Sequence, residues 1–291
     1  MKIALFGKHS QQSFVSQLLE FFNLLESKQV EVLIDADFYD YLKTILPSPP
    51  KVSDFIMGDK FEADFALSIG GDGTLLTTAK RVGRQQIPMV GINTGRLGYL
   101  SASDGHDLPQ LLEELMEGRY TIEKRARLML SSETVQFDYP LALNEVAITK
   151  RDVAAMLHIH ASINGEYLSD YQADGLILST ATGSTAYSLS VGGPILMPEN
   201  RSIILSPVAP HSLTMRPIVL SADSYVDLKV ESRSKHYLVS LDGRPVSVPA
   251  DTRLRVRLDE VPVLLVRREK QSFVETLRSK MMWGKDLRNG D

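Results

Sequence analysis

Apolar runs alternate with segments of helical spacing along the first hundred residues of the chain. A short apolar run predicts a buried strand, and apolar residues every three or four positions predict a helix. This alternation favours an α/β fold with an open, mostly parallel sheet covered by helices. The strands are expected at Ile3–Phe6, Val30–Ile34, Phe65–Ile69 and Pro88–Ile92, and the helices at residues 14–25, Asp37–Leu46, Leu75–Arg84 and Leu108–Gly118.

The pattern changes at about residue 120, where many short β-type runs begin. Turn signals such as Asn164-Gly165 and Asp242-Gly243 separate the runs, and this spacing predicts an all-β second domain. The boundaries are therefore expected at residues 1–119 for the α/β domain and 120–261 for the β-rich domain. The runs are Leu141–Ile148, His158–Ile163, Leu176–Ser179, Ile203–Ser206, Tyr225–Val230, Leu238–Leu241 and Arg253–Leu258.

The last 30 residues contain an apolar run, Val263–Val266, and a helical pattern, Phe273–Met281. The apolar residues of both segments need an apolar surface elsewhere in the chain to pack against. We expect residues 262–291 to return to the first domain or to the boundary between the domains.

Composition narrows the possible partners and compartment. The chain has 291 residues and a net charge of −4, without the basic stripe of a nucleic-acid-binding protein. A nucleic acid is therefore not expected as a partner. No apolar segment approaches 18 residues, so a membrane is not expected as a partner either. The chain has no cysteine, which excludes disulfides, thiolate chemistry and cysteine-based zinc sites. The cytoplasm is the expected compartment.

The segment Gly70-Gly-Asp-Gly-Thr74 lies between a predicted strand and a predicted helix. Glycines let backbone N–H groups turn toward a ligand, and the start of a helix carries a partial positive charge, so the turn suits phosphate. A carboxylate in such a turn needs a cation beside it or a chemical task. The pattern indicates a kinase in which Asp72 is a base or a metal ligand. The residues expected at the phosphates are Gly70, Gly71, Gly73 and Thr74.

Two further segments place polar groups beside apolar strands. Residues 173–194 include seven serine and threonine hydroxyls, a density that suits a polar ligand, although a solvated loop has the same composition. Asn144-Glu145 lies inside a β-type run. A carboxylate there can accept both hydrogens of a ribose diol, and the alternative is an exposed strand edge.

Two histidines and three arginines at alternating positions say less about function. His158 and His160 share one face of a predicted strand, but no cysteine or acid lies near them in the sequence, so we interpret them as packing and predict no metal-ligating residues. Arg253, Arg255 and Arg257 alternate with apolar residues, as on the solvated face of a strand.

Together and in this order, these segments resemble the NAD kinases. The resemblance covers nearly the whole chain, and the segment at Thr182–Ser190 discriminates this family best. Six segments carry the resemblance: Ser68–Thr74, Gly91–Leu100, Leu143–Val146, Asp174–Ile177, Thr182–Ser190 and Gly192–Pro194.

The resemblance implies a kinase that uses ATP to phosphorylate the adenosine 2′-hydroxyl of NAD, giving NADP and regulating the NAD/NADP pool. Asp72 would take the proton from that hydroxyl, and a divalent cation, Mg²⁺, would screen the phosphates. Asp174 would face the nicotinamide end and favour NAD⁺ over NADH. The first domain would then bind phosphate and the second the dinucleotide. The residues placed on NAD are Asp72, Gly73, Asn144, Glu145, Asp174, Thr185, Ala186, Tyr187, Ser188, Leu189, Ser190, Ala209 and Arg244.

Two positions depart from the family pattern. Ala155 stands where a histidine or arginine is common, and Arg244 stands where a glutamine is frequent. The chain also lacks the Gly-x-Gly-x-x-Gly of a hydride-transfer enzyme after its first strand, where it has only Gly7, so NAD is expected as a phosphoryl acceptor. A lipid or sugar kinase with the same turn and a non-catalytic dinucleotide sensor are the rival hypotheses. NAD and ATP are the expected partners, together with further copies of the chain in a homo-oligomer (a dimer or tetramer).

Overall fold

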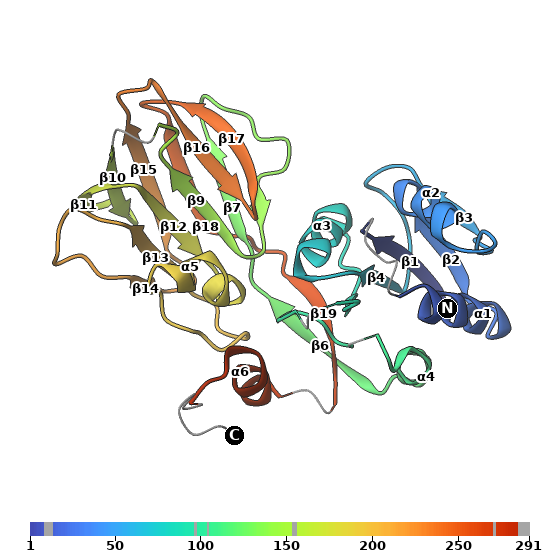
Figure 1. Cartoon of the computed structure of the whole chain (residues 1–291). Coiled ribbons are helices and arrows are strands. Elements are labelled where there is room, and N and C mark those ends of the chain that lie inside the picture. The colour runs from blue at the N-terminus through green and yellow to red at the C-terminus, as the bar shows by residue number, and fades with distance from the viewer. Residues whose placement is uncertain (9–13, 96–97, 104, 153–155, 270–271, 285–291) are drawn as a thin grey trace. The chain divides into compact units, whose positions relative to one another are not determined.

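The computed structural model describes residues 1–8, 14–95, 98–103, 105–152, 156–269 and 272–284 (Figure 1). Contacts divide the chain into two compact units. The first unit comprises Met1–Lys124 and Val263–Asp291, and the second comprises Arg125–Pro262. The first is an α/β unit and the second is β-rich, which confirms the two predicted classes.

One sheet forms the centre of the first unit, with the strand order β3-β2-β1-β4-β5-β19-β6. Strands β1 to β5 and β19 pair in parallel with their neighbours, as the alternation of strands and helices predicted. The strands are β1 (Lys2–Gly7), β2 (Glu31–Asp35), β3 (Asp54–Ile56), β4 (Phe65–Ile69), β5 (Met89–Ile92), β6 (Tyr120–Arg125) and β19 (Val263–Arg268).

The first four helices of the unit cover this sheet because each has an apolar stripe. Buried residues of the first, second and fourth helices form one core with the strands, and the third helix contacts β1, β4 and β5. The helices are α1 (Val15–Ser27), α2 (Ala36–Ile45), α3 (Asp72–Val82), α4 (Leu108–Glu117) and α6 (Phe273–Met281). Among the helices described, none combines the length and the apolar character that a membrane crossing requires.

The structure differs from the sequence prediction at the start of α3. The helix begins at Asp72, inside the glycine-rich segment, and not at Leu75. Gly71 is its N-cap residue, so the first turn contains the Asp72 side chain and the N–H groups that no helical carbonyl accepts.

The C-terminal segment contributes the sixth strand of the first unit's sheet, β19, which pairs with β5 through Leu265 and Met89. Arg268 at the end of β19 donates hydrogen bonds to Asp107 and, at 2.6 Å, to Glu114 of α4. Helix α6 has no buried residue.

The second unit is a sandwich of two six-stranded sheets. The order is β11-β10-β15-β18-β7-β8 in one sheet, called sheet B here, and β14-β13-β12-β9-β16-β17 in the other, called sheet C. Alternate residues of both sheets form a single apolar core. The strands are β7 (Leu128–Ser132), β8 (Leu141–Ala142), β9 (Glu145–Thr149), β10 (Leu157–Ile163), β11 (Glu166–Ala173), β12 (Gly175–Ser179), β13 (Ile203–Val208), β14 (Ile218–Leu220), β15 (Tyr225–Glu231), β16 (His236–Leu241), β17 (Arg244–Pro249) and β18 (Arg253–Leu258).

Two hairpins of the sandwich turn at the predicted dipeptides. Asn164-Gly165 joins β10 to β11, and Asp242-Gly243 joins β16 to β17; all four residues have positive φ, which asparagine, aspartate and glycine tolerate best. The expectation of an all-β domain was wrong at one place. The hydroxyl-rich segment forms a 3₁₀ turn, Thr182–Thr185, and a short helix, α5 (Tyr187–Ser190).

Candidate active site

The Asp72 carboxylate is fixed by backbone hydrogen bonds. Tyr99 donates its N–H to Oδ2 at 2.7 Å, and Leu100 donates its N–H to Oδ1 at 3.1 Å. Asp72 is the first residue of α3 and is half-buried. A carboxylate held at both oxygens keeps one orientation, which a general base needs in order to meet a particular proton.

Glycines make this arrangement possible at two positions. A Cβ on Gly98 would lie 2.1 Å from Asp72 Oδ1, so only glycine lets the loop approach the carboxylate. Gly70 has a φ of 153°, and a Cβ there would lie 2.3 Å from Thr74 Oγ1. The Gly70 N–H donates to Ile92 O at 2.8 Å, so the role of Gly70 in the turn is conformational and this N–H is not available to a phosphate.

A cavity of about 540 Å³ lies beside this turn within the first unit. Its lining includes Gly73 and Thr74 from the turn and the cations Lys8 and Arg81. Two carboxylates, Asp35 and Asp37, also line it, and Arg81 lies 3.1 Å from Asp35 Oδ2. Thr74 is 7% exposed, and its hydroxyl has no hydrogen-bond partner among the described residues. A buried hydroxyl without a partner is unfavourable unless a ligand supplies one. The cavity therefore has the cations and hydrogen-bond groups that an anionic ligand requires.

Helix α6 brings a lysine to the same loop. The Lys280 ammonium lies 5.9 Å from the centre of the Tyr99 ring, and Phe273 packs edge-on against that ring at 6.3 Å between centroids. Burial lowers the pKa of Lys280, while the negative charge of Asp72 raises it. A cation thus lies within electrostatic range of the candidate base.

In the second unit, a single aspartate positions Asn144 and Glu145. The Asp242 carboxylate accepts the backbone N–H groups of Leu143 at 2.7 Å, Asn144 at 2.8 Å and Glu145 at 3.2 Å. Burial raises the pKa of Asp242, and these three bonds oppose that effect. The contact joins residues about 100 positions apart in the chain and holds the β8–β9 turn in one conformation.

Glu145 has an unusual environment for a carboxylate. Only 8% of the residue is exposed, and burial, followed by repulsion from Asp242, raises its pKa to about 7. The backbone of Tyr187 donates one hydrogen bond, while Glu145 Oε2 and the neighbouring Asn144 Oδ1 have no partner among the described residues. Two buried acceptors without donors can accept hydrogen bonds from the two hydroxyls of a diol or from another pair of donors.

The hydroxyl-rich segment packs against this turn. Thr180 Oγ1 donates to Leu143 O at 2.6 Å and accepts the Gly183 N–H at 3.1 Å. A Cβ on Gly183 would lie 2.1 Å from Asn144 O, so the close packing depends on this glycine. Ser188 is fully buried, and its hydroxyl lies 3.2 Å from that of Ser206. The structure leaves Thr185, Ala186, Tyr187, Leu189 and Ser190 partly or fully exposed.

Asp174 forms an ion pair. Lys150 Nζ lies 2.7 Å from Asp174 Oδ1, and both side chains are about one-third exposed or less. Ala209 follows the strand that pairs with Gly175, and it has a φ of 43°, which is uncommon for a residue with a Cβ. The fold therefore brings Asp174, Lys150 and Ala209 to one end of β12.

Arg244 begins β17 and donates to Leu141 O at 2.7 Å, with its guanidinium 4.9 Å from the centre of the Tyr139 ring. It therefore lies beside the turn that contains Asn144. Ala155, the other departure from the family pattern, lies outside the described residues.

Sequence reasoning assigned no role to four residues of these sites. Gly98 lies in a segment used only for the family resemblance, and Asp242 was interpreted only as a turn residue. Lys150 and Lys280 carry no motif of their own. The sequence held a signal for Asp242 alone: it is an acidic residue in a tight turn, and a carboxylate there can accept hydrogen bonds from a neighbouring segment as well as from its own turn.

Family models match most of the chain. The model described as "ATP-NAD kinase N-terminal domain" matches residues 3–120, and the model described as "ATP-NAD kinase C-terminal domain" matches residues 143–267. A protein named NAD kinase in Bacteroides fragilis is 45% identical over 289 residues, with 99% of this chain and 100% of that protein covered. The protein of that name in Porphyromonas gingivalis is 40% identical over 287 residues, with 99% of each chain covered.

Solved structures give the same result for the fold. A crystal structure of yeast NADH kinase complexed with NADH superposes with a TM-score of 0.88 at 24% identity, covering 99% of this chain and 89% of the yeast chain. An NAD kinase from Archaeoglobus fulgidus in complex with ATP has a TM-score of 0.75 at 26% identity, covering 97% of this chain and 99% of that chain. The matches in sequence, motif order and fold all lead to one conclusion: the chain belongs to the ATP-NAD kinase family.

Proposed function

We propose that the protein is an ATP-dependent NAD kinase, which transfers the γ-phosphoryl group of ATP to the adenosine 2′-hydroxyl of NAD and releases NADP and ADP. The observation that carries this proposal is the Asp72 carboxylate, fixed by two backbone N–H groups beside a cavity whose lining includes Lys8 and Arg81. Phosphoryl transfer needs alignment and charge neutralisation more than covalent help from the protein.

The first unit binds the donor in this proposal. The cavity beside α3 takes the triphosphate, with Lys8 and Arg81 near its charges and the N–H groups of Asp72 and Gly73 at the start of the helix toward the phosphate oxygens. Gly71, Gly73 and Thr74 keep the phosphate role predicted from the sequence. Asp72 takes the proton of the attacking hydroxyl as the new P–O bond forms.

Mg²⁺ fits the donor set of this cavity. Asp37 lines it, as do the hydroxyls of Thr74 and Thr77, and hard oxygen ligands together with substrate phosphates are the usual environment of this ion. The buried Thr74 hydroxyl without a partner is the most direct sign of a missing ligand. When bound, the ion would screen the phosphate charge from Asp72, while the Tyr99 and Leu100 N–H groups keep the carboxylate in place.

The second unit binds NAD in this proposal. Glu145 Oε2 and Asn144 Oδ1 accept hydrogen bonds from the adenosine part of the substrate, because both are buried and lack donors. The other contacts come from Asp174 with Ala209 and from the exposed residues of the segment Thr185–Ser190. Arg244 contributes by holding the β8–β9 turn through Leu141.

The C-terminal helix completes the donor site in this proposal. The contacts of Phe273 and Lys280 with Tyr99 support a tail that packs over the Asp72 loop. Lys280 would add positive charge beside the transferred phosphate. The same contacts support the prediction that residues 262–291 return to the first domain.

The experiment is a coupled assay of NADP formation with and without Mg²⁺, on the wild type and on Asp72→Asn. Asparagine cannot take a proton, and its NH₂ group cannot accept one of the two backbone N–H bonds that fix Asp72, so turnover should fall by at least about 10²–10⁴-fold while NAD binding changes little. A variant with near-normal kcat would show that Asp72 is not the base. No turnover of NAD by the wild type, with activity on a diacylglycerol or a hexose phosphate instead, would contradict the proposed substrate.

The compartment and the assembly stay predictions. The substrates NAD and ATP are both abundant in the cytoplasm, which is where we expect the enzyme. Light scattering on the purified chain would show whether it forms the predicted dimer or tetramer.

A further inference from the structure

We propose that His158, His160 and Glu231 form a binding site for a zinc-class divalent cation on the face of sheet B that points away from the sandwich core. The sequence shows only two histidines at alternate positions. The fold adds the acids that the sequence did not place near them. The ligand atoms of the three residues all lie within 4.8 Å of one another.

Strand pairing explains how the three side chains meet. Along β10, Leu157, Ile159 and Ala161 are buried in the core, so His158 and His160 lie on the opposite face. Glu231 on β15 is directly opposite His158 in the antiparallel register. Directly opposed residues of neighbouring strands have Cβ atoms about 5 Å apart, which lets one ion reach both strands.

The distances suit a tetrahedral ion after small side-chain movements. His160 Nε2 lies 3.2 Å from Glu231 Oε1, and the rings of His158 and His160 are nearly perpendicular, with centroids 5.8 Å apart. Metal–ligand bonds of about 2.0–2.2 Å at tetrahedral angles separate the ligand atoms by roughly 3.3 Å. The His160–Glu231 pair already has this separation, and His158 must approach by about 1.5 Å at most.

A fourth residue orients the central ligand. Asp170 on β11 is opposite His160, and its Oδ1 lies 2.7 Å from His160 Nδ1. Nε2 faces Glu231 Oε1 at 3.2 Å, so a metal there replaces any proton that the two groups share, and the Asp170 bond then keeps the remaining ring proton on Nδ1. Metal-bound histidines usually have such a carboxylate behind them. Asp170 therefore orients the His160 ring so that Nε2 faces Glu231, the other ligand of the proposed site.

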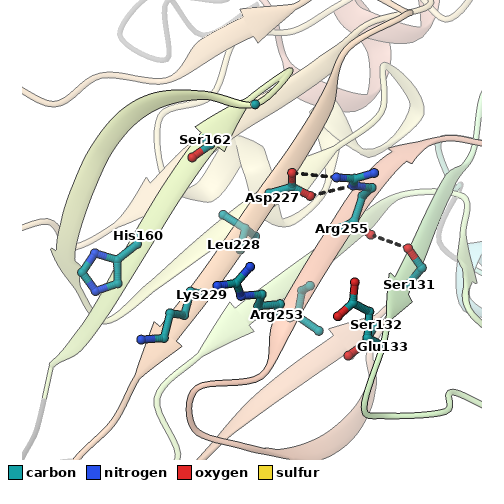
Figure 2. Close-up of a pocket in the computed structure, with 12 residues that line it drawn as sticks. Ser131, Ser132, Glu133, His160, Ser162, Asp227, Leu228, Lys229, Arg253 and Arg255 are labelled. Carbon is teal, nitrogen blue, oxygen red and sulfur yellow. Dashed lines mark hydrogen bonds and ion pairs between the residues drawn. The ribbon is translucent and has the colours of Figure 1, made fainter.

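The neighbouring cation does not close the site. Lys229 Nζ lies 3.6 Å from Glu231 Oε1 but closer, at 3.2 Å, to Asp251 Oδ1, so it keeps an ion pair when Glu231 turns to a metal. His160 and Lys229 also line a hollow of about 530 Å³ on the sheet surface (Figure 2). The imidazole is therefore reachable from solvent.

The ligand set selects the metal class. Two imidazoles and one carboxylate suit Zn²⁺, with a water in the fourth position, and Cu²⁺ binds such sets tightly, whereas Mg²⁺ prefers oxygen ligands alone. This site therefore differs in chemistry from the Mg²⁺ site proposed for catalysis. A bound ion would join β10 to β15 and stabilise the second unit.

Isothermal titration of the untagged full chain with ZnCl₂, in excess MgCl₂ and without nucleotide, tests the site. We expect one zinc per chain at this site in the wild type. His158→Gln, His160→Gln and Glu231→Gln should each weaken its affinity by about 100-fold or more, and Asp170→Asn by about 10–100-fold. His236→Gln, at a histidine of sheet C, is the matched control and should leave the affinity unchanged.

Further measurements show whether a loss of zinc binding in a variant comes from a folding defect. Circular dichroism and the rate of NADP formation should be unchanged in the metal-free variants, since these residues lie outside the proposed catalytic machinery. Zinc should raise the melting temperature of the wild type and of His236→Gln but not of His160→Gln. X-ray absorption should show two imidazoles in the zinc shell. Equal zinc affinity in the wild type and His160→Gln, or no zinc binding at all, would overturn the proposal and leave the cluster as a proton-linked ion pair.

Discussion

Glu145→Gln separates what stabilises the fold from what binds the substrate. Burial and the nearby Asp242 raise the pKa of Glu145 from 4.5 to about 7 in the folded protein. The acid form is thus favoured by folding. As pH rises from about 4.5 to 7, the contribution of Glu145 to the stability of the ligand-free wild type falls, because the unfolded chain ionises this group more easily. At about 1.36 kcal/mol per pKa unit, the difference amounts to roughly 3 kcal/mol above pH 7.

The amide carries no charge at any of these pH values, so the free energy of unfolding of the variant does not fall for this reason. We expect Glu145→Gln to have about the wild-type free energy of unfolding at pH 4.5 and to exceed it by about 1–3 kcal/mol at pH 8. Urea unfolding at a series of pH values measures the difference. Glu166→Gln, at an exposed glutamate of the same unit, is the control for the substitution itself.

Substrate binding should change in the opposite direction. A hydrogen bond to a charged group contributes about 1.5–3 kcal/mol, so the KM for NAD should rise by about 10–150-fold in Glu145→Gln. Donors from NAD favour the ionised carboxylate, and wild-type NAD binding near pH 7 should therefore release protons, which titration calorimetry in two buffers detects. Parallel pH profiles of stability in both proteins, or no proton release, would refute the reasoning.

Three other substitutions test the remaining contacts. Gly98→Ala should lower kcat by about 100-fold, since its Cβ would lie 2.1 Å from Asp72 Oδ1, while Gly95→Ala, where nothing lies within 4 Å, should be near normal in the same assay. Lys150→Met should raise the ratio of kcat/KM for NAD⁺ to that for NADH, because the 2.7 Å ion pair partly neutralises Asp174; an unchanged ratio would show that Asp174 does not sense the nicotinamide charge. Lys280→Met should lower kcat/KM for ATP by about 10-fold and Lys280→Arg should restore most of it, whereas equal losses in both would assign the lysine to packing.

The fold was predictable where local pattern decides it. The buried strands β1, β4 and β5 match their apolar runs within one residue, and the turns at Asn164-Gly165 and Asp242-Gly243 occur where the dipeptides indicated. Strand β3 was missed, since only Ile56 of its three residues is buried. The start of α3 was misplaced because Asp72 and Gly73 have weak helix propensity, and the structure nevertheless begins the helix there.

The candidate site was predictable only one segment at a time. Motifs identified Asp72, Asn144 and Glu145, but no local pattern shows that Asp242 would hold Asn144 from 98 positions away. The interpretation of His158 and His160 as packing failed to consider acids for the same reason, because Glu231 comes opposite them only through antiparallel pairing. The preference for NAD⁺ was reasoned from Asp174 alone, and the partner Lys150 weakens that argument.

The position of β19 has a consequence for synthesis on the ribosome. Its neighbours β5 and β6 leave the exit tunnel long before residues 263–268 do. The sheet therefore lacks the strand between β5 and β6 while the whole second unit is translated. At about 5–20 residues per second, the roughly 170 residues between β5 and β19 take about 10–30 s. Arg125–Pro262 is continuous and can fold first, and the N-terminal half of the chain exposes apolar strand edges until the C-terminal strand arrives. Because an unpaired strand edge can pair with another chain, the interval before β19 is made is a period of aggregation risk for the nascent first unit.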